Sequence, residues 1–174
     1  MERTKDHIIL IGFMGCGKST VGIRLSYRLR RSLTDTDKLI EKEQKCSISE
    51  IFAKRGEAHF RELETECLRT LLERNGSEII SVGGGLPVKE ENRKLLKKLG
   101  VVFYLRATAD TIYERVKHDT TRPLLQDKNP MEKIRTLMAE RSAIYEMAAD
   151  VIIDVDGKDF DTILNEIEAS YYKM

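Results

Sequence analysis

The chain has 174 residues, 41% of them hydrophobic, so it can bury one full core but is too short for a motor or a multi-module ATPase. Its 30 basic and 29 acidic residues give a formal net charge of +1, which argues against a basic face for nucleic acid. No apolar run approaches the roughly 20 residues needed to cross a bilayer. We therefore expect a single domain over residues 1–174, monomeric and cytoplasmic, with small-molecule ligands and no membrane or nucleic-acid partner.

The first expected strand, Ile8–Ile11, leads directly into the segment Gly12–Ser19, which reads GFMGCGKS. This segment fits the phosphate-binding pattern G-x-x-x-x-G-K-[ST], in its required place before a helix expected over Thr20–Arg30. In this pattern the backbone amides surround phosphate oxygens, while Lys18 spans the β- and γ-phosphates and Ser19 binds Mg²⁺. An ordinary glycine turn, the alternative, would need neither side chain. The predicted ATP-binding residues here are Gly15, Cys16, Gly17, Lys18, Ser19 and Thr20, with Lys18 also catalytic.

The cysteines are Cys16, Cys46 and Cys67, an odd number without metal-ligand spacing. Such cysteines are typical of reduced thiols rather than of a disulfide framework or a zinc site. Cys16 lies among inward-facing amides that would favour its thiolate, and a redox role for this residue is therefore a minor alternative.

A short second strand, Ser32–Thr34, ends at an Asp-Thr-Asp turn. A P-loop protein needs an acidic group near its serine to hold Mg²⁺ or its waters. We expect Asp35 to serve the metal, and Asp37 to accept a hydrogen bond from an attacking hydroxyl and then take its proton. The alternative is that Asp37 merely caps the following helix, expected over Lys38–Glu43.

Two further helices are expected, over Ser49–Lys54 behind a Ser47 cap and over Glu57–Arg74. Arg61 lies on the second of them, with glutamates four positions before and three positions after it. Arg61 is therefore either a solvated residue paired with these glutamates or a guanidinium that binds a ligand.

A buried strand over Glu78–Val82 leads to three consecutive glycines, Gly83–Gly85. Three glycines cost conformational entropy that a simple turn does not need, so they favour a place where substrate lies directly against main chain. A helix over Lys89–Leu99 and a strand over Val101–Leu105 follow.

Thr108 is expected to cap a helix over Ala109–Lys117, which is followed by the irregular stretch 118–130. Connections of this length in compact domains are usually lids or disordered. A lid that closed over ATP would exclude water and bring Arg122 to the phosphates, where charge spreads in the transition state. The alternative is a mobile surface loop with an incidental arginine.

The last elements expected are a helix over Met131–Met147, a strand over Val151–Val155 and a helix over Asp159–Tyr172. Apolar strands that alternate with helices indicate a parallel sheet covered on both faces, a three-layer α/β/α architecture. Such sheets bind ligands at the carboxyl ends of their strands, and each candidate residue lies at such an end or on a helix beside it. Arg141, late in the first of these helices and four residues before Tyr145, has no clear role from the pattern alone.

Taken together, these residues resemble the shikimate kinase family over essentially the whole chain. The matching features are Gly12–Thr20, Asp35-Thr36-Asp37, Phe60-Arg61-x-x-Glu64, Gly83-Gly84-Gly85, Thr121-Arg122-Pro123-Leu124-Leu125, and Glu140-Arg141 with Tyr145. The resemblance implies a P-loop kinase fold with a five-stranded parallel sheet, a mobile lid at about 118–130 and a substrate-binding segment at about 33–61. It also implies phosphorylation of the 3-hydroxyl of shikimate by ATP with Mg²⁺, giving shikimate 3-phosphate and ADP, in aromatic amino acid biosynthesis.

The resemblance further implies that Arg122 binds ATP phosphate and that Arg115 lies by the adenine. Family members often place an arginine or proline against the adenine after the last strand, whereas this chain offers Lys158 there. The implied shikimate-binding residues are Asp37, Arg61, Gly83, Gly84, Gly85 and Arg141. A gluconate kinase or a nucleoside monophosphate kinase is the enzymatic alternative. A nucleotide switch that binds a protein is an alternative of another class, although the guanine-reading motif Asn-Lys-x-Asp is absent from the sequence.

Overall fold

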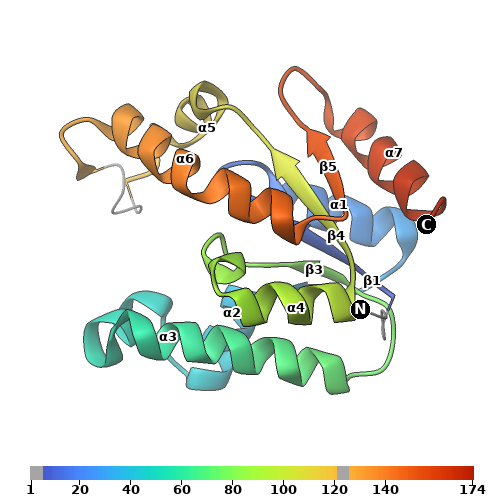
Figure 1. Ribbon diagram of the computed structural model, residues 1–174, viewed down its shortest axis with the longest axis horizontal. Coiled ribbons are helices and arrows are strands. Elements are labelled where there is room, and N and C mark those ends of the chain that lie inside the picture. The colour runs from blue at the N-terminus through green and yellow to red at the C-terminus, as the bar shows by residue number, and fades with distance from the viewer. Residues whose placement is uncertain (1–5, 121–125) are drawn as a thin grey trace.

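The apolar runs of the sequence form a five-stranded parallel sheet with helices on both faces, in a computed structural model that describes residues 6–120 and 126–174 (Figure 1). The strand order is β2-β3-β1-β4-β5. The strands are β1 (His7–Ile11), β2 (Leu33–Asp35), β3 (Ile79–Ser81), β4 (Gly100–Arg106) and β5 (Val151–Asp154). The expected three-layer architecture with a five-stranded parallel sheet is confirmed.

Strand β1 lies at the centre of the sheet, where Ile8 pairs with Ile79 on one side and Val101 on the other. Every residue of β1 is buried, as expected for a parallel strand covered on both faces. Each buried isoleucine contributes about 2 kcal/mol through the hydrophobic effect. The central strand is therefore well fixed by burial on both faces, and the loop that follows β1 begins at a rigid position.

Helices α1 and α7 cover one face of the sheet, and α4 and α6 cover the other, with α3 packed outside α4 (Figure 1). Helix α2 follows β2, and α5 packs against α6. The bounds are α1 (Lys18–Leu29), α2 (Thr36–Gln44), α3 (Ile48–Glu73), α4 (Glu90–Leu99), α5 (Ala109–Val116), α6 (Pro130–Ala148) and α7 (Phe160–Tyr171), with a short 3₁₀ helix η1 (Leu86–Val88) after the glycines.

Helix α3 replaces the two separate helices expected on either side of Gly56. Gly56 has φ 80° and ψ 171°, which is not helical, so the chain bends at the expected place without leaving the helix for a full loop. The expected Ser47 cap is confirmed, because its side chain accepts the Glu50 N–H while Glu50 reaches back to the Ser47 N–H.

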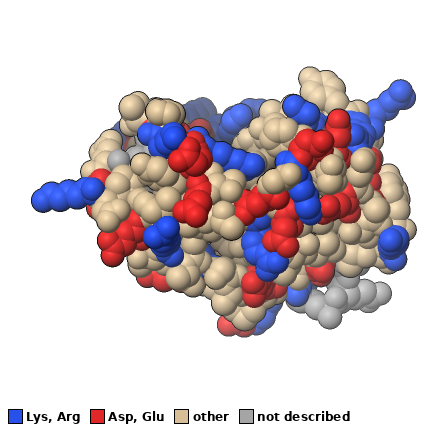
Figure 2. All heavy atoms as spheres, turned by 90° about the horizontal axis from the view of Figure 1, so that it is seen from above, with Lys and Arg blue, Asp and Glu red and all other residues tan. Residues whose placement is uncertain are grey.

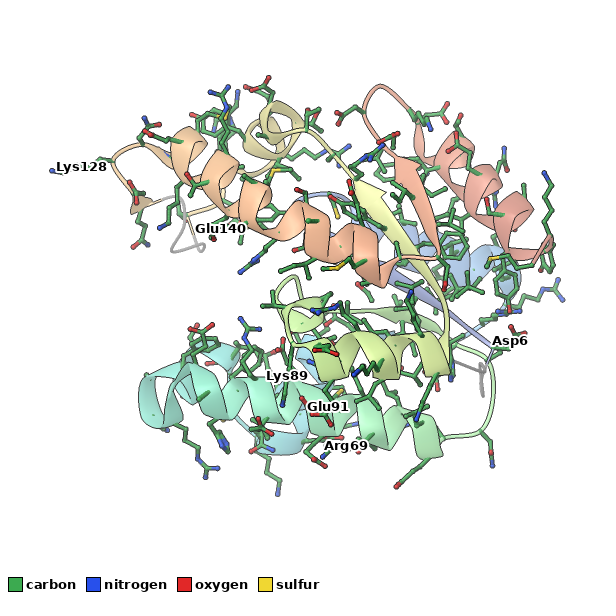
Figure 3. The ribbon with its side chains drawn as sticks, viewed as in Figure 1. Asp6, Arg69, Lys89, Glu91, Lys128 and Glu140 are labelled. Carbon is green, nitrogen blue, oxygen red and sulfur yellow. The ribbon has the colours of Figure 1, made fainter. Side chains whose placement is uncertain are left out.

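Charged side chains tie α3 to α4 at the surface. Lys89 Nζ lies 2.9 Å from a carboxylate oxygen of Glu62, and Arg69 is paired with Glu91. Arg69, Lys89 and Glu91 lie along the boundary between the two helices (Figure 3). On the face seen from above, positive and negative side chains are interspersed (Figure 2). Exposed pairs of this kind contribute little to stability, typically less than about 1 kcal/mol each.

Within residues 6–120 and 126–174, no helix has the length and apolar character required to cross a membrane. Residues 121–125, which include Arg122 and the middle of the expected lid, lie outside the described residues. The lid and the role of Arg122 therefore stay predictions.

Candidate active site

The phosphate-binding loop leaves the carboxyl end of β1 and leads into α1. Gly12, Gly15 and Gly17 have φ values of 149°, 76° and 107°, a region that other residues rarely adopt. A Cβ on Gly12 would also lie 2.7 Å from the Leu105 carbonyl oxygen, and one on Gly15 would lie 2.6 Å from Val116 Cγ1. The backbone conformation therefore favours glycine at all three positions, and close packing beneath the loop requires it at Gly12 and Gly15.

Lys18, the first residue of α1, folds over the loop that precedes it. Its Nζ donates to the carbonyl oxygens of Gly12 at 2.6 Å and Phe13 at 3.2 Å. Gly17 occupies the N-cap position without a side-chain cap, and the first turn of α1 contains no acidic residue. The positive end of the helix and the lysine charge therefore face the same small volume, an arrangement suited to phosphate.

A cavity of about 520 Å³ lies above this loop, within the size range of small-molecule sites. The predicted site residues that line it are Gly15, Gly17, Lys18, Ser19, Thr20, Asp35, Asp37, Gly83, Gly84 and Arg115. Residues predicted from four separate stretches of sequence therefore share one cavity.

Asp35 and Asp37 perform different local tasks at the start of α2. Asp35 is the N-cap, and its Oδ1 accepts the Lys38 N–H at 3.1 Å. The alternative in which Asp37 serves as the cap is therefore wrong, because Asp37 lies inside the first helical turn. Its carboxylate approaches Gly83 so closely that a Cβ there would lie 2.7 Å from Oδ1. Burial raises the pKa of Asp37, the charge of Asp35 raises it further, and Lys18 opposes both.

Arg61 makes the ion pairs of the first alternative that the sequence left open, and its binding of a ligand stays a prediction. Its guanidinium donates to Glu64 at 2.8 Å and to Glu57 at 3.2 Å, as the helical spacing predicts. The guanidinium is also partly buried, since the Arg61 side chain is 24% exposed. A Cβ on Gly85 would lie 2.5 Å from Nη1, so the guanidinium presses directly against the glycine loop, Gly83–Gly85.

Glu64 is 1% exposed in its side chain, beneath Arg61. Burial raises the pKa of Glu64 to about 7, although the Arg61 guanidinium opposes the shift. The charges of Asp37 and Arg141 also act on this carboxyl, the first raising its pKa and the second lowering it. The buried carboxyl that Arg61 contacts is thus also influenced by the charges of Asp37 and Arg141.

Arg141 approaches the same region from α6. Its guanidinium carbon lies 5.8 Å from the centre of the Phe13 ring in the phosphate-binding loop. One helical turn later, Tyr145 donates a hydrogen bond to the Gly84 carbonyl oxygen at 2.6 Å. Helix α3 therefore approaches the glycine loop through Arg61, and α6 contacts it through Tyr145, one turn after Arg141.

Of the two residues predicted to lie by the adenine, the structure places Arg115 at the cavity but not Lys158. Arg115 lies against the loop and donates to the carbonyl oxygens of Gly15 at 3.2 Å and Cys16 at 3.0 Å. Lys158 is paired with Glu166 at 2.7 Å and does not belong to the described lining of the cavity. Cys16 is buried, and its thiol is free.

Phe160, the first residue of α7, lines the cavity although the sequence pattern did not single it out. Its ring lies near Gly17, and the guanidinium carbon of Arg24 lies 4.6 Å from the ring centre. The sequence did contain a signal for this residue, because Phe160 is an aromatic residue directly after the loop that follows the last strand. It lies two positions beyond Lys158, which the sequence analysis named as the candidate for the adenine contact.

A phosphate-binding loop at the central strand of a parallel sheet shares a cavity with the Asp37 carboxylate. The Arg61 guanidinium lies against Gly85, and that of Arg141 lies over Phe13 of the loop. This combination of fold and site defines a P-loop kinase for a small acidic acceptor.

The family model described as shikimate kinase matches residues 14–171. The chain is 42% identical to the shikimate kinase of Thermodesulfovibrio yellowstonii, over 97% of this chain and 96% of that protein. It is 45% identical to the shikimate kinase of Geobacter metallireducens, over 92% and 89% of the two chains. The structure of shikimate kinase from Acinetobacter baumannii in complex with shikimate matches with a TM-score of 0.88 at 34% identity, covering 98% of this chain and 95% of that one. The chain belongs to the shikimate kinase family.

Proposed function

We propose that this chain transfers the γ-phosphoryl group of ATP to the 3-hydroxyl of shikimate, giving shikimate 3-phosphate and ADP in aromatic amino acid biosynthesis. The observation that carries the proposal is the shared cavity, in which the phosphate-binding loop faces Asp37. Arg61 lies against the glycine loop, and Arg141 lies over Phe13, one helical turn before the Tyr145 that binds the glycine loop. A ring with one carboxylate and several hydroxyls needs guanidinium donors at one end and a carboxylate acceptor at the other.

On the acceptor side, we assign Arg61 and Arg141 to the shikimate carboxylate and Asp37 to the reacting hydroxyl. The glycine loop supplies main chain that a small ring can approach closely, because a side chain at Gly83 or Gly85 would collide with Asp37 or Arg61. Glu64, held at 2.8 Å from Arg61, fixes the direction of that guanidinium. The acceptor is thus bound by groups that are already oriented before it arrives.

On the nucleotide side, we assign the phosphates to the amides of the loop and to Lys18, whose Nζ lies over it. Gly15, Cys16, Gly17, Ser19 and Thr20 complete the proposed phosphate cradle. Arg115 and Phe160 border the cavity beyond Gly17 and suit the adenine, since one is a planar cation and the other an aromatic ring. Lys158 stays a prediction, and so does Arg122.

We propose Mg²⁺ as the cofactor, with Ser19 and Asp35 nearest to it. Both line the cavity beside Lys18, and both offer the oxygen atoms that Mg²⁺ prefers. Within residues 6–120 and 126–174 there is no cluster of three or more carboxylate, histidine or cysteine side chains suited to a metal. The two oxygen donors Ser19 and Asp35 fit an ion bound through one or two protein oxygens, substrate phosphates and water. When bound, the ion would neutralise charge on the β- and γ-phosphates.

Asp37 has the chemistry of a proton acceptor in this reaction. Burial and the neighbouring Asp35 raise its pKa, which makes it a better base than an exposed aspartate. Phosphoryl transfer passes through a loose transition state, so the hydroxyl loses its proton late. We therefore assign most of the rate enhancement to positioning and charge neutralisation, with Lys18 as the main described cation, and a smaller share to Asp37.

An acceptor panel tests this proposal. The chain is incubated with ATP, Mg²⁺ and either shikimate, gluconate or a nucleoside monophosphate, and the products are identified by mass spectrometry. The expected result is a phosphorylated product from shikimate alone, with the phosphoryl group on the 3-hydroxyl by phosphorus NMR. Preferential phosphorylation of gluconate or of the nucleotide would assign the chain to one of the alternative kinases.

We further propose that the protein works in the cytoplasm as a monomer. Three free thiols, two of them buried, suit a reducing compartment. The cavity is formed within one chain, so the proposed reaction needs no residue from a second copy.

A further inference from the structure

The glycine loop is held at both ends by buried side chains. At its start, the Gly83 N–H donates to Thr36 Oγ1 at 3.1 Å. Just after it, Asn92 Nδ2 donates to the Leu86 carbonyl oxygen at 2.9 Å. Thr36 and Asn92 are both 0% exposed, so α2 and α4 fix the two ends of the loop from inside the protein. These contacts leave the middle of the loop to be oriented by another group.

Tyr145 supplies that contact from α6. Its hydroxyl donates to the Gly84 carbonyl oxygen at 2.6 Å, and its side chain is buried, with the ring packed 5.1 Å from that of Tyr104. Burial raises the pKa of Tyr145 to about 12, more than the Arg141 guanidinium lowers it. The phenol therefore stays protonated, and remains a donor, throughout the range in which an enzyme works.

The hydrogen bond fixes a whole peptide plane. In a trans peptide the C=O of Gly84 and the N–H of Gly85 point in opposite directions. With the carbonyl held toward α6, the Gly85 N–H points away from α6. Within the described residues, neither the Gly84 N–H nor the Gly85 N–H has a protein acceptor at hydrogen-bond distance. Both glycines are partly exposed, so these donors are available to a ligand.

Helix α6 carries a second group toward the same place. Arg141 precedes Tyr145 by four residues, so the two side chains lie on one face of the helix, one turn apart. Arg141 lies over Phe13 while Tyr145 holds Gly84, and Figure 1 shows the segment after β3 between α6 and α3. A single rigid helix therefore sets both the guanidinium and the peptide plane that we place around the acceptor.

We propose that Tyr145 is a positioning residue for the acceptor: its hydroxyl sets the Gly84–Gly85 peptide so that the Gly85 N–H and Arg141 meet the same acceptor molecule. This role rests on the proposed function, because it concerns the site assigned to shikimate. Tyr145 does not touch the reacting atoms and acts through Gly84.

The test compares Tyr145→Phe with the matched control Tyr104→Phe. Each variant removes one hydroxyl from the same buried pair of rings, but only the Tyr145 hydroxyl binds the glycine loop. Tyr145→Phe is expected to raise the KM for shikimate about tenfold, the size of one lost hydrogen bond, and to leave the KM for ATP within about twofold. Tyr104→Phe is expected to leave both constants within about twofold of the wild type.

Amide hydrogen exchange provides a readout that does not depend on the acceptor. The Gly83 N–H is bonded to Thr36 Oγ1, and the Leu86 N–H is bonded to the Gly83 carbonyl oxygen. In Tyr145→Phe, both amides are expected to exchange at least several-fold faster than in wild type. Unchanged exchange there would overturn the anchoring role, whatever the acceptor. An unchanged KM for shikimate, or an equal rise in both KM values with a lower melting temperature, would overturn the positioning role. A wild type without shikimate-dependent ADP release would contradict the proposed function instead, and exchange would still decide the anchoring.

Discussion

Glu64 is far from the ordinary state of a glutamate, because its carboxyl group lies buried under the guanidinium of Arg61. Burial raises its pKa from 4.5 to about 7. The folded state thus holds this proton more tightly than the unfolded chain does. Glu64 therefore favours the folded state at low pH, and this contribution is lost as the pH rises from about 4.5 to about 7.

Glu64→Gln should remove this titration. From pH 5 to pH 8, the free energy of unfolding of wild type is expected to fall by up to about 3 kcal/mol relative to that of the variant, because only wild type loses the contribution of the buried carboxyl. Urea unfolding at the two pH values measures the difference. The matched control is Glu62→Gln, at a side chain that is 65% exposed, which should keep the pH dependence of wild type. A constant gap between Glu64→Gln and wild type across this range would contradict the buried titration.

Asp37→Asn keeps the shape of the side chain but removes its ability to take a proton. We expect kcat to fall by about 100-fold or more, while the affinity for ATP changes little, because the phosphate contacts are made by the loop. In wild type, kcat/KM should fall toward acid at a pH above that of an ordinary aspartate, since the pKa of Asp37 is raised. Steady-state kinetics and calorimetric ATP binding measure these effects. Unchanged turnover would remove the role assigned to Asp37.

Phe160→Ala tests the nucleotide end of the cavity, where the sequence pattern pointed to Lys158 instead. Removal of the ring should raise the KM for ATP about tenfold and leave the KM for shikimate within about twofold, as loss of one stacking contact predicts. Lys158→Ala serves as the comparison, because its ammonium is paired with Glu166 and should matter less. A larger effect of Lys158→Ala than of Phe160→Ala would restore the prediction made from the sequence.

At the scale of elements, the glycine loop connects the two halves of the site. Gly85→Ala would place a Cβ 2.5 Å from Arg61 Nη1, and the end of a long side chain can move away at little cost in stability. We therefore expect the KM for shikimate to rise about tenfold with a nearly unchanged melting temperature.

Gly157→Ala should show the opposite behaviour. No atom lies within 4 Å of the added Cβ, but the φ of 70° is unfavourable for alanine. We expect a loss of about 1 kcal/mol in unfolding free energy with a normal KM for shikimate. If Gly85→Ala instead resembled Gly157→Ala, the close contact between the loop and Arg61 would not govern acceptor binding.

The elements were largely predictable from local pattern, but the junctions between them were not. Two aspartates separated by one residue both suit the start of a helix, and periodicity cannot choose between them. In the structure Asp35 is the cap, so α2 begins at Thr36 rather than at Lys38, and β2 includes Asp35. The same limit applies to Arg61, whose helical pairs were predictable while its approach to Gly85 depends on how α3 packs.

At the scale of the molecule, alternating strands and helices predicted a parallel sheet covered on both faces, and the family resemblance implied five strands; both are confirmed. The order β2-β3-β1-β4-β5 was not predictable, because local pattern does not encode which strands become neighbours. That order makes β1 central and brings its loop beside the end of β3, so that residues such as Gly84 and Tyr145, 61 positions apart, meet. The phosphate-binding loop was recognisable since its residues are contiguous, whereas the anchoring of the glycine loop was not.

The most direct test of the proposed reaction is the rate of ADP release from ATP and Mg²⁺ with and without shikimate, for wild type and for Lys18→Met. We expect rapid release by wild type only when shikimate is present, and no release above background by Lys18→Met under either condition, because the lysine charge at the phosphates is lost. The same rate of ADP release with and without shikimate, or full activity of Lys18→Met, would contradict a phosphoryl transfer centred on this loop.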